Sequence, residues 1–284
     1  MSRRSLILFI SLSIIWGLPY LFIKYAIAEL DPTIVVFART APAAIILLAW
    51  SAYRGVLKEN LKFWKAATVF AFVEMVFPWW LITDAERQLD SGITGLLIAT
   101  VPLFGVIIAR IRGDKTASSP KRMAGLALGL VGVGLLVGLD PGDLNLPLMQ
   151  VAMVLVSSVG YAVGPIAISS TLGKADSPTI IGMSLAILGI VYIPFAWLNW
   201  PTTMPSTQAL SSLAVLAIVC TVAAFLIFFK LIEAIGGISA TLVTYINTAV
   251  AVVLGVVILG EPVTLGLIIG FPLVLGGSWL ASKH

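Results

Sequence analysis

One acidic residue, Glu74, lies inside a long apolar run of this sequence and is the strongest candidate for a functional group in that run. Glu74 lies near the middle of the run from Trp64 to Thr83. A charged carboxylate at the centre of a membrane span costs roughly 3 kcal/mol on insertion scales unless it is protonated, paired or wetted by a cavity. Two functional roles fit Glu74, a proton-coupling site or an anchor for a substrate amine. The structural alternative is a buried hydrogen bond between two helices, for example with Arg39.

Arg39 is the other charged residue inside an apolar run, and its depth suggests a structural role. It lies about two helical turns from one end of the run from Thr33 to Ala52. A side chain at that depth can extend its charge to the interface. We therefore expect Arg39 to snorkel or to pair with Asp84 or Glu74.

Aromatic and polar side chains share helical faces in several apolar runs. Trp16 and Tyr20 are spaced i, i+4, and the same spacing relates other pairs in later runs. Lipid cannot hydrogen-bond to such faces, so they should point to protein or water. For the hydroxyl residues the alternative is ordinary packing, in which Ser and Thr bond to helix backbones. We expect these faces to line an aromatic, largely uncharged substrate cavity formed by Trp16, Tyr20, Glu74, Met75, Trp79, Ser157, Tyr161, Thr244, Tyr245 and Asn247.

The sequence lacks the residue sets of the common enzyme classes. Its only histidine is the terminal His284, and Cys220 is a single thiol in an apolar run, so neither a metal site nor a disulfide follows. Phosphate-binding Gly-Lys-Ser/Thr loops, His-Glu-x-x-His and nucleophile elbows are absent from the sequence. We predict no catalytic residue, no metal and no cofactor.

The elements that carry these residues are membrane-spanning helices. Hydrophobic residues make up 60% of the chain, charged residues make up 11%, and the mean hydropathy is +1.08. The stretch from Ser177 to Phe229 has no charged residue, and as one helix it would reach about 80 Å, whereas a bilayer core is about 30 Å thick. It must therefore fold into two spans. The ten predicted spans are Ser5–Tyr25, Thr33–Ala52, Trp64–Thr83, Ser91–Ile111, Met123–Leu139, Leu148–Ser170, Thr179–Leu198, Ala209–Phe229, Ile238–Leu259 and Leu265–Ala281.

Charged residues between the spans predict the orientation of the chain. Of the 17 basic residues, 14 fall on one side of the membrane, and only Lys24 and Arg87 fall on the other. The positive-inside rule makes the first side cytoplasmic, with both termini there. The net charge of +4 is thus a topology signal and no evidence of nucleic-acid binding. We expect a multi-pass protein of the cell (inner) membrane, with Arg54 and Lys115 inside and Glu86 and Asp140 outside. The first run is too long for a cleaved signal peptide.

A weak internal repeat divides the chain into two halves. The segment Asp31-Pro32-Thr33 recurs as Ser177-Pro178-Thr179, at an offset of 146 residues. Five spans per half is an odd number, so the second half must begin on the opposite side of the membrane. The predicted fold class is an all-α integral membrane protein with ten transmembrane helices in two inverted five-helix repeats, residues 1–139 and 140–284.

Glycines at i, i+4 spacing in the fifth and tenth spans predict close helix packing. The pairs are Gly125 with Gly129, Gly134 with Gly138, and Gly266 with Gly270. They favour packing inside one subunit, and therefore a monomer, with a homodimer through these two helices as the alternative.

Several motifs give the chain a family resemblance that covers nearly its whole length. It resembles the EamA-domain carriers of the drug/metabolite transporter superfamily, and within them the amino-acid exporters. The motifs are Trp16-Gly17, Arg39, the segment from Glu74 to Glu86, the segment from Gly92 to Pro102, and Leu259-Gly260-Glu261-Pro262. The first half departs from the closing Gly-Glu signature, with Gly113-Asp114-Lys115 in its place. The resemblance implies ten helices, two EamA halves and export of small metabolites.

These observations together predict a secondary transporter. We expect it to export small neutral metabolites, foremost amino acids including aromatic ones, by alternating access, with a small-molecule substrate and the lipid bilayer as its partners. The first alternative is a carrier of phosphorylated sugars or nucleotide sugars, which would favour several buried basic residues. A passive channel or a membrane scaffold is the second alternative.

Overall fold

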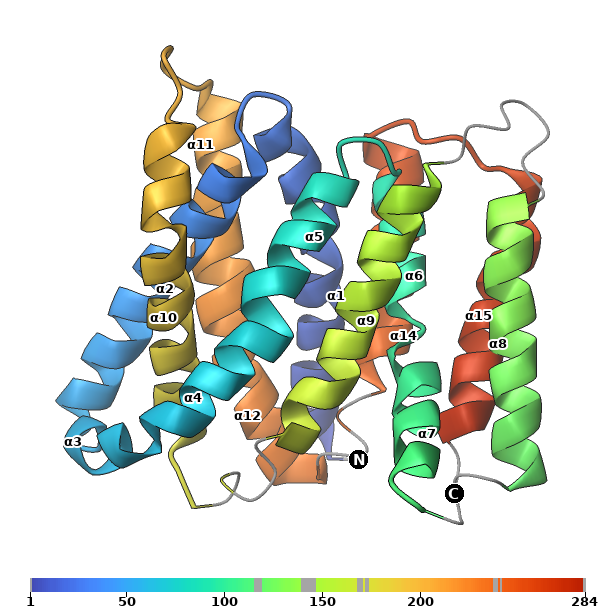
Figure 1. Ribbon diagram of the computed structural model, residues 1–284, viewed down its shortest axis with the longest axis horizontal. Helices are drawn as coiled ribbons and strands as arrows, with labels where there is room; N and C mark the ends of the chain where they lie inside the picture. Colours follow the sequence, from blue (N-terminus) through green and yellow to red (C-terminus); the bar gives the residue numbers. More distant parts are fainter. Residues whose placement is uncertain are drawn as a thin grey trace.

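The computed structural model describes residues 2–114, 119–138, 147–167, 171, 174–236, 240 and 242–282. These residues form apolar helices that stand side by side and are joined by short loops (Figure 1). The first half contains α1 (Arg3–Ile27), α2 (Pro32–Tyr53), α3 (Leu57–Asn60), η1 (Leu61–Phe63), α4 (Trp64–Phe70), η2 (Ala71–Val76), α5 (Phe77–Ala85), α6 (Ser91–Ile98), α7 (Val101–Ile111) and α8 (Pro120–Gly138). The second half contains α9 (Leu148–Ala167), α10 (Ser177–Leu198), α11 (Thr207–Ala214), η4 (Val215–Ala223), α12 (Ala224–Ile235), α14 (Val243–Ile258) and α15 (Leu265–Ser282).

The predicted all-α membrane fold is confirmed. Within the ranges that the structure describes, nine continuous helical stretches are long and apolar enough to cross a membrane, and α14 is a shorter apolar helix. Three of the nine, Leu57–Ala85, Ser91–Ile111 and Thr207–Ile235, combine several of the helical segments named above. The start of the predicted ninth span falls partly on residues outside the described ranges.

The second helix of each half begins in the same way. Asp31 accepts a hydrogen bond from the backbone N–H of Thr33 (2.9 Å) at the start of α2. Asp176 accepts one from the N–H of Thr179 (3.1 Å) at the start of α10. In both helices a proline occupies the first turn, where its missing N–H costs nothing. An acidic cap followed by proline therefore sets where each of these helices starts.

Two π-helical segments interrupt the third and eighth spans, and they occupy related positions in the two halves. They are η2 and η4, and an offset of 146 residues places Glu74 of η2 opposite Cys220 of η4. In the third span Pro78 follows η2, and because proline has no N–H it cannot bond to the carbonyl of Glu74 four residues earlier. A π-turn widens the helix and displaces side chains, which is frequent at functional sites.

Helices α8 and α15 form a closely packed pair at one side of the bundle (Figure 1). A Cβ at Gly132 would lie 2.7 Å from the backbone nitrogen of Val274, and a Cβ at Gly270 would lie 2.9 Å from the carbonyl oxygen of Gly132. Their glycines therefore allow the two backbones of this pair to approach within one chain. No described atom lies within 4 Å of a Cβ built at Gly134 or Gly138.

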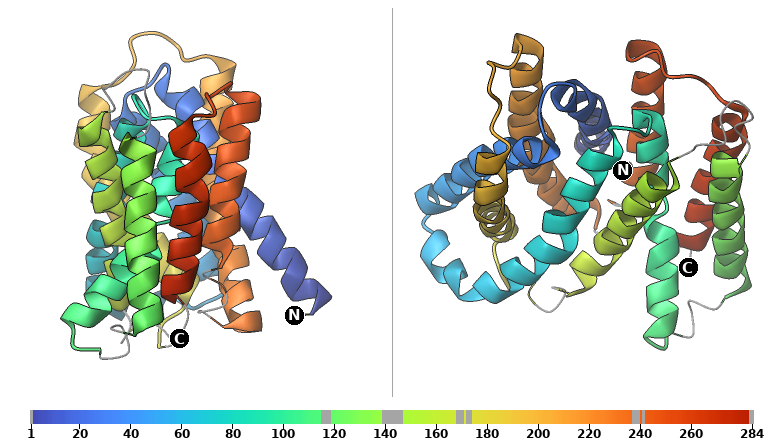
Figure 2. Two further views of the ribbon diagram at one scale, coloured as in Figure 1. Left: turned by 90° about the vertical axis from the view of Figure 1, so that its right-hand side faces the viewer. Right: turned by 45° about the horizontal axis from the view of Figure 1, so that its top comes forward.

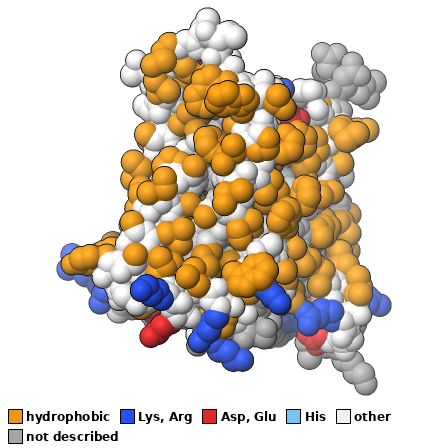
Figure 3. All heavy atoms as spheres, turned by 60° about the vertical axis from the view of Figure 1, so that its left-hand side comes forward, with side chains coloured by type: hydrophobic (Ala, Val, Ile, Leu, Met, Phe, Trp, Pro, Cys, Tyr) orange, Lys and Arg blue, Asp and Glu red, His pale blue; other side chains and the backbone are white. Residues whose placement is uncertain are grey.

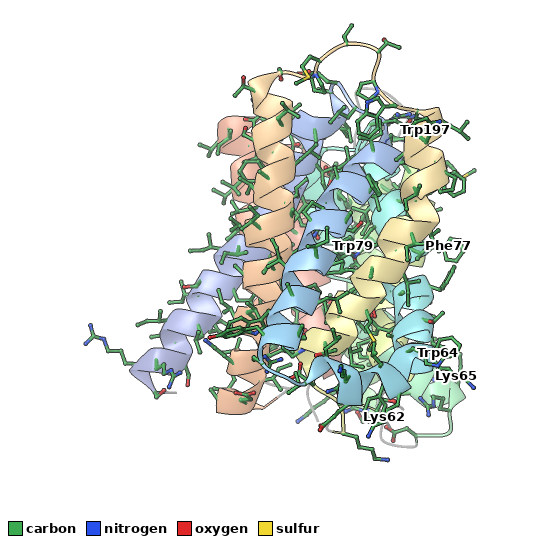
Figure 4. The ribbon with its side chains drawn as sticks, turned by 90° about the vertical axis from the view of Figure 1, so that its left-hand side faces the viewer. Lys62, Trp64, Lys65, Phe77, Trp79 and Trp197 are labelled. Carbon is green, nitrogen blue, oxygen red and sulfur yellow. The ribbon has the colours of Figure 1, made fainter. Side chains whose placement is uncertain are left out.

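The surface divides into a wide apolar belt and two ends of different charge. Lys and Arg side chains gather at the lower end in the space-filling view, below a surface that is mostly hydrophobic (Figure 3). We call this the basic end, defined by Arg54, Lys62 and Lys65, and we call the other the acidic end, defined by Glu29 and Asp31. Figure 4 shows Trp197 near the acidic end and Trp64 near the basic end, as expected for interfacial tryptophans. In the side view the first turns of α1 lean away from the bundle at the basic end (Figure 2).

Candidate functional site

A large cavity lies inside the bundle and draws its walls from both halves of the chain. Its volume is about 1260 Å³. Arg54, Lys230 and Glu233, all exposed residues of the basic end, line one part of it, and Ile23 and Ile82 line its deepest part toward the acidic end. The cavity is therefore open at the basic end.

Eight of the ten predicted site residues line this cavity. Those brought together are Trp16, Tyr20, Glu74, Met75, Trp79, Tyr161, Thr244 and Asn247. The structure also adds wall residues from α2 and α10, two helices that the sequence pattern did not include.

Ser157 and Tyr245 are the two predicted site residues that do not line the cavity. Ser157 is fully buried and donates to the carbonyl oxygens of Met153 (2.9 Å) and Pro78 (3.2 Å), so it joins α9 to α5. The Tyr245 hydroxyl lies 3.2 Å from that of Ser282 on α15. Both residues thus perform the helix packing that was the alternative reading of such polar faces.

An aromatic cluster on α12 forms part of the wall, and we did not anticipate it. The Trp16 ring lies 4.8 Å from that of Phe228 and 6.1 Å from that of Phe225, measured between centroids. Phe225 and Phe229 stack at 6.2 Å. Their i, i+3 and i, i+4 spacing places them on one face of the helix, which is the signal that could have identified them.

Arg39 lies in the cavity wall, so our expectation of snorkelling or of pairing with Asp84 or Glu74 was wrong. Its guanidinium carbon lies 4.0 Å from the centroid of the Trp79 ring. Its Nε donates a hydrogen bond to the Thr221 hydroxyl at 3.1 Å. Arg39 lies about two turns from the start of α2, and the ring of Trp79 provides a cation–π surface that keeps the guanidinium inside.

Glu74 faces the same cavity from the π-helical segment η2. Its Oε2 is buried, and among the described residues it has no hydrogen-bond partner. A Cβ at Gly164 of α9 would overlap this carboxylate. Glycine at position 164 therefore makes the space that Glu74 occupies.

The acidic end is closed by polar contacts between loops. Glu29 accepts hydrogen bonds from the hydroxyl and from the backbone N–H of Ser206, the latter at 2.7 Å. These bonds lower the pKa of Glu29, with the side-chain bond contributing most. Arg87 lies 3.0 Å from Asp31 and 3.6 Å from Asp84. None of these residues lines the cavity, and the contact between Glu29 and Ser206 joins the two halves of the chain at this end.

Glu261 joins the two halves just below the same end. Gly260 adopts a positive φ of 68°, a conformation that favours glycine, and it turns the chain after α14 so that Glu261 points at the start of α6. There the carboxylate accepts from the N–H groups of Ser91 (2.6 Å) and Gly92 (3.0 Å). The Gly-Glu motif is therefore a helix cap supplied by the opposite half.

Some of the sequence predictions cannot be placed in the structure. Lys115 and Asp140 lie outside the described residues. In the part of the chain that the structure describes, no group of three or more His, Cys, Asp and Glu side chains gathers into a metal site.

Comparison with known proteins gives relatives that are named as transporters. The chain is 29% identical over 253 residues to the uncharacterized inner membrane transporter YedA of Escherichia coli strain K12, covering 88% of this chain and 81% of YedA. It is 25% identical over 293 residues to an uncharacterized transporter of Archaeoglobus fulgidus, covering 100% of this chain and 99% of the relative.

A solved crystal structure shares the fold. It superposes with a TM-score of 0.68 at 18% sequence identity and covers 99% of this chain and 97% of its own. At that identity the likeness concerns the fold alone.

The family model of the EamA-like transporter family matches twice, at residues 3–138 and 148–283. In the described part of the chain, the first matched segment contains five of the nine long helical stretches, and the second contains the other four and the shorter α14. The protein is a multi-pass membrane transporter, and the chain belongs to the EamA-like transporter family.

Proposed function

We propose that this protein is a secondary transporter that exports small neutral metabolites, foremost amino acids including aromatic ones, by alternating access. The observation that carries the proposal is the cavity of about 1260 Å³, which is open at one end of the bundle and closed at the other. A carrier in one of its two access states has this form. The aromatic wall around Trp16 and Trp79 suits an apolar or aromatic side chain.

The orientation and the repeat are parts of the same proposal. By the positive-inside rule the basic end is cytoplasmic, so the cavity would be open inward. In Figure 1, α1 begins at the basic end and α9 begins at the opposite end. These opposite directions support an inverted relation between residues 1–139 and residues 140–284, as alternating access requires.

A monomer is the proposed working unit. Four of the glycines that were candidates for a dimer seam, Gly125, Gly129, Gly266 and Gly270, lie in the contact between α8 and α15 within one chain, whereas Gly134 and Gly138 face open space among the described residues. Their use inside the subunit supports the monomer.

A second candidate substrate class is an organic anion such as a phosphorylated sugar. Three basic side chains line the cavity, Arg39, Arg54 and Lys230. Arg54 is paired with Asp176 at 2.5 Å, and Lys230 is an exposed residue near Glu233 in the sequence. Only Arg39 lies deep in the cavity, which supports a substrate with at most one negative group over a phosphate ester with two.

Counterflow in liposomes tests the proposal. Purified protein, reconstituted and preloaded with unlabelled phenylalanine, should take up labelled phenylalanine transiently and with saturation. Trp79→Ala should reduce this counterflow about tenfold, since an aromatic contact and its burial supply a few kcal/mol at most. Trp197→Ala is the matched control, because Trp197 lies near the acidic end and is 78% exposed. Non-saturable flux would indicate a channel, and counterflow of hexose phosphate without amino-acid counterflow would favour the second class.

A further inference from the structure

Arg39 presents unused hydrogen-bond donors to the interior of the bundle. The Trp79 ring covers one face of the Arg39 guanidinium, and the Thr221 hydroxyl accepts a hydrogen bond from its Nε–H. A guanidinium carries five N–H groups, so four remain on the two terminal nitrogens. Among the described residues no acid lies within ion-pair distance of Arg39. The group is thus held in one orientation, with its planar fork unpaired.

The two fixed contacts come from different halves of the chain. Trp79 belongs to α5 of the first half, and Thr221 belongs to the π-helical segment η4 of the second. The Thr221 hydroxyl itself donates to the carbonyl oxygen of Leu216 at 2.8 Å, five residues back in the π-turn. The π-turn therefore fixes the hydroxyl that holds Arg39.

An unpaired arginine in the cavity wall is only partly hydrated. Arginine keeps its charge in proteins, and although Arg39 is partly exposed to the open cavity, the surrounding wall removes part of its hydration at a cost in free energy. The other basic residues of the wall do not share this condition, since Arg54 is paired at 2.5 Å with Asp176 and Lys230 is exposed. A ligand anion that binds Arg39 would offset the cost and form bidentate hydrogen bonds.

A second titratable group, the carboxyl of Glu74, faces the same cavity at a separate point. Glu74 has one buried oxygen that lacks a hydrogen-bond partner in the described part of the chain. Tyr161 is within electrostatic range of both Arg39 and Glu74 and lines the cavity with them. Apart from the residues at the mouth, the described wall thus carries one basic group, Arg39, and one acidic group, Glu74, with the Tyr161 phenol in electrostatic range of both.

We propose that Arg39 determines specificity by binding the carboxylate of a zwitterionic amino acid, whose ammonium group is held by Glu74. This inference rests on the proposed function and adds to it a requirement on the substrate. A free carboxylate and a free amine are both needed, and the side chain packs against the aromatic wall. Amides and esters of the same amino acid lack the anion and bind weakly.

Competition against labelled phenylalanine in the counterflow assay tests the requirement on the parent protein. The competitors are phenylalaninamide, which keeps the amine and lacks the carboxylate, and 3-phenylpropionate, which keeps the carboxylate and lacks the amine. Each should bind about tenfold or more weakly than phenylalanine, since a hydrogen bond to a charged group contributes about 1.5–3 kcal/mol. Phenylalaninamide that competes as well as phenylalanine overturns the inference.

The variant Arg39→Gln assigns the effect to this residue. Arg39→Gln should weaken the binding of phenylalanine about tenfold or more. It should leave the binding of phenylalaninamide within about twofold of the parent, because only phenylalanine presents an anion. Lys65→Gln removes one positive charge from an exposed site at the basic end and is the matched control. Equal weakening of both ligands by Arg39→Gln overturns the inference.

A second variant and the substrate range of the parent protein separate the inference from the proposed function. If Arg39→Gln fails to fold, Thr221→Val removes the hydrogen bond between the Thr221 hydroxyl and Nε of Arg39. This variant should still weaken the binding of phenylalanine more than the binding of phenylalaninamide. A parent protein that transports none of the common amino acids overturns the proposed function and the inference together. A parent that transports phenylalanine without discriminating against its amide overturns the inference alone.

Discussion

The guanidinium of Arg54 lies 2.5 Å from the carboxylate of Asp176, and this ion pair joins the end of α2 to the start of α10 at the mouth of the cavity. The same carboxylate accepts from the N–H and the hydroxyl of Thr179, at 3.1 and 2.6 Å. The backbone N–H of Asp176 donates to the side-chain oxygen of Asn60 at 2.8 Å. One residue therefore caps a helix of the second half and is held by two groups of the first.

The ion pair predicts a specific dependence of stability on pH. Burial acts to raise the pKa of Asp176, but hydrogen bonds from Arg54 and Thr179 outweigh it and hold the pKa below its usual range. The stabilisation is then complete above the ordinary aspartate pKa of about 3.9 and is lost as the pH falls through the lower pKa of the folded protein.

Replacing Asp176 by Asn should remove this dependence. Asparagine keeps the helix cap, so the substitution removes only the ion pair. Because the side chains of Arg54 and Asp176 are 31% and 19% exposed, the free energy of unfolding should fall by at most about 1 kcal/mol. Thermal unfolding in detergent at a series of acidic pH values checks it. An acid-induced loss of stability in Asp176→Asn that matches the parent would contradict the prediction.

Glu86 should produce the opposite slope. It lies one residue beyond the span Leu57–Ala85, is 0% exposed, and neither carboxylate oxygen has a hydrogen-bond partner among the described residues. Burial raises the pKa of Glu86 well above its ordinary value, Lys24 lowers it in part, and Glu261 adds to the rise. The folded protein therefore keeps a proton on Glu86 that the unfolded chain releases above about pH 4.3. The free energy of unfolding should fall as the pH rises from about 4.3 to the higher pKa that Glu86 has in the folded protein.

The variant Glu86→Gln keeps the shape of the side chain and cannot titrate. As the pH rises above about 4.3, its melting temperature should fall less than that of the parent. Glu59→Gln, at an exposed position on α3, is the control and should follow the parent. If the melting temperatures of Glu86→Gln and the parent change in parallel with pH, Glu86 does not take up a proton on folding.

Glu261→Gln should destabilise the protein by about 1 kcal/mol, because it removes a negative charge from the start of α6 while keeping one acceptor oxygen. The carboxylate bonds at 2.6 Å to Ser91 N and 3.0 Å to Gly92 N are the contacts at risk. The free energy of unfolding in detergent measures the effect. A variant as stable as the parent would mean that the cap from the second half contributes little.

Glu74→Gln should change transport more than stability. The variant keeps the volume of the side chain beside Gly164 and removes the titratable carboxyl that faces the cavity. Counterflow should lose its preference for substrates with a free amine, while the melting temperature stays within about 2 °C of the parent. Normal transport together with a much lower melting temperature would support the structural alternative, a buried bond between helices.

Sequence patterns predicted the helices and grouped several residues that the structure places in the cavity wall, for a clear reason. Lipid requires long apolar helices, so composition and charge show where each span begins and ends. Residues at i, i+4 spacing share a face, so Trp16 with Tyr20 and Met75 with Trp79 were correctly grouped, and all four line the cavity.

The tertiary structure decided which faces meet and which long side chains reach inward. A polar face can meet a cavity or a neighbouring helix, and only packing distinguishes Asn247, which lines the cavity, from Tyr245, which lies against Ser282. Arg39 has a flexible side chain of several bonds, so its depth in the sequence did not determine its direction. The Trp79 ring and the Thr221 hydroxyl, from spans 40 and 182 residues away, hold it in the cavity. Contacts between residues so far apart depend on helix tilt and crossing, which local spacing does not encode.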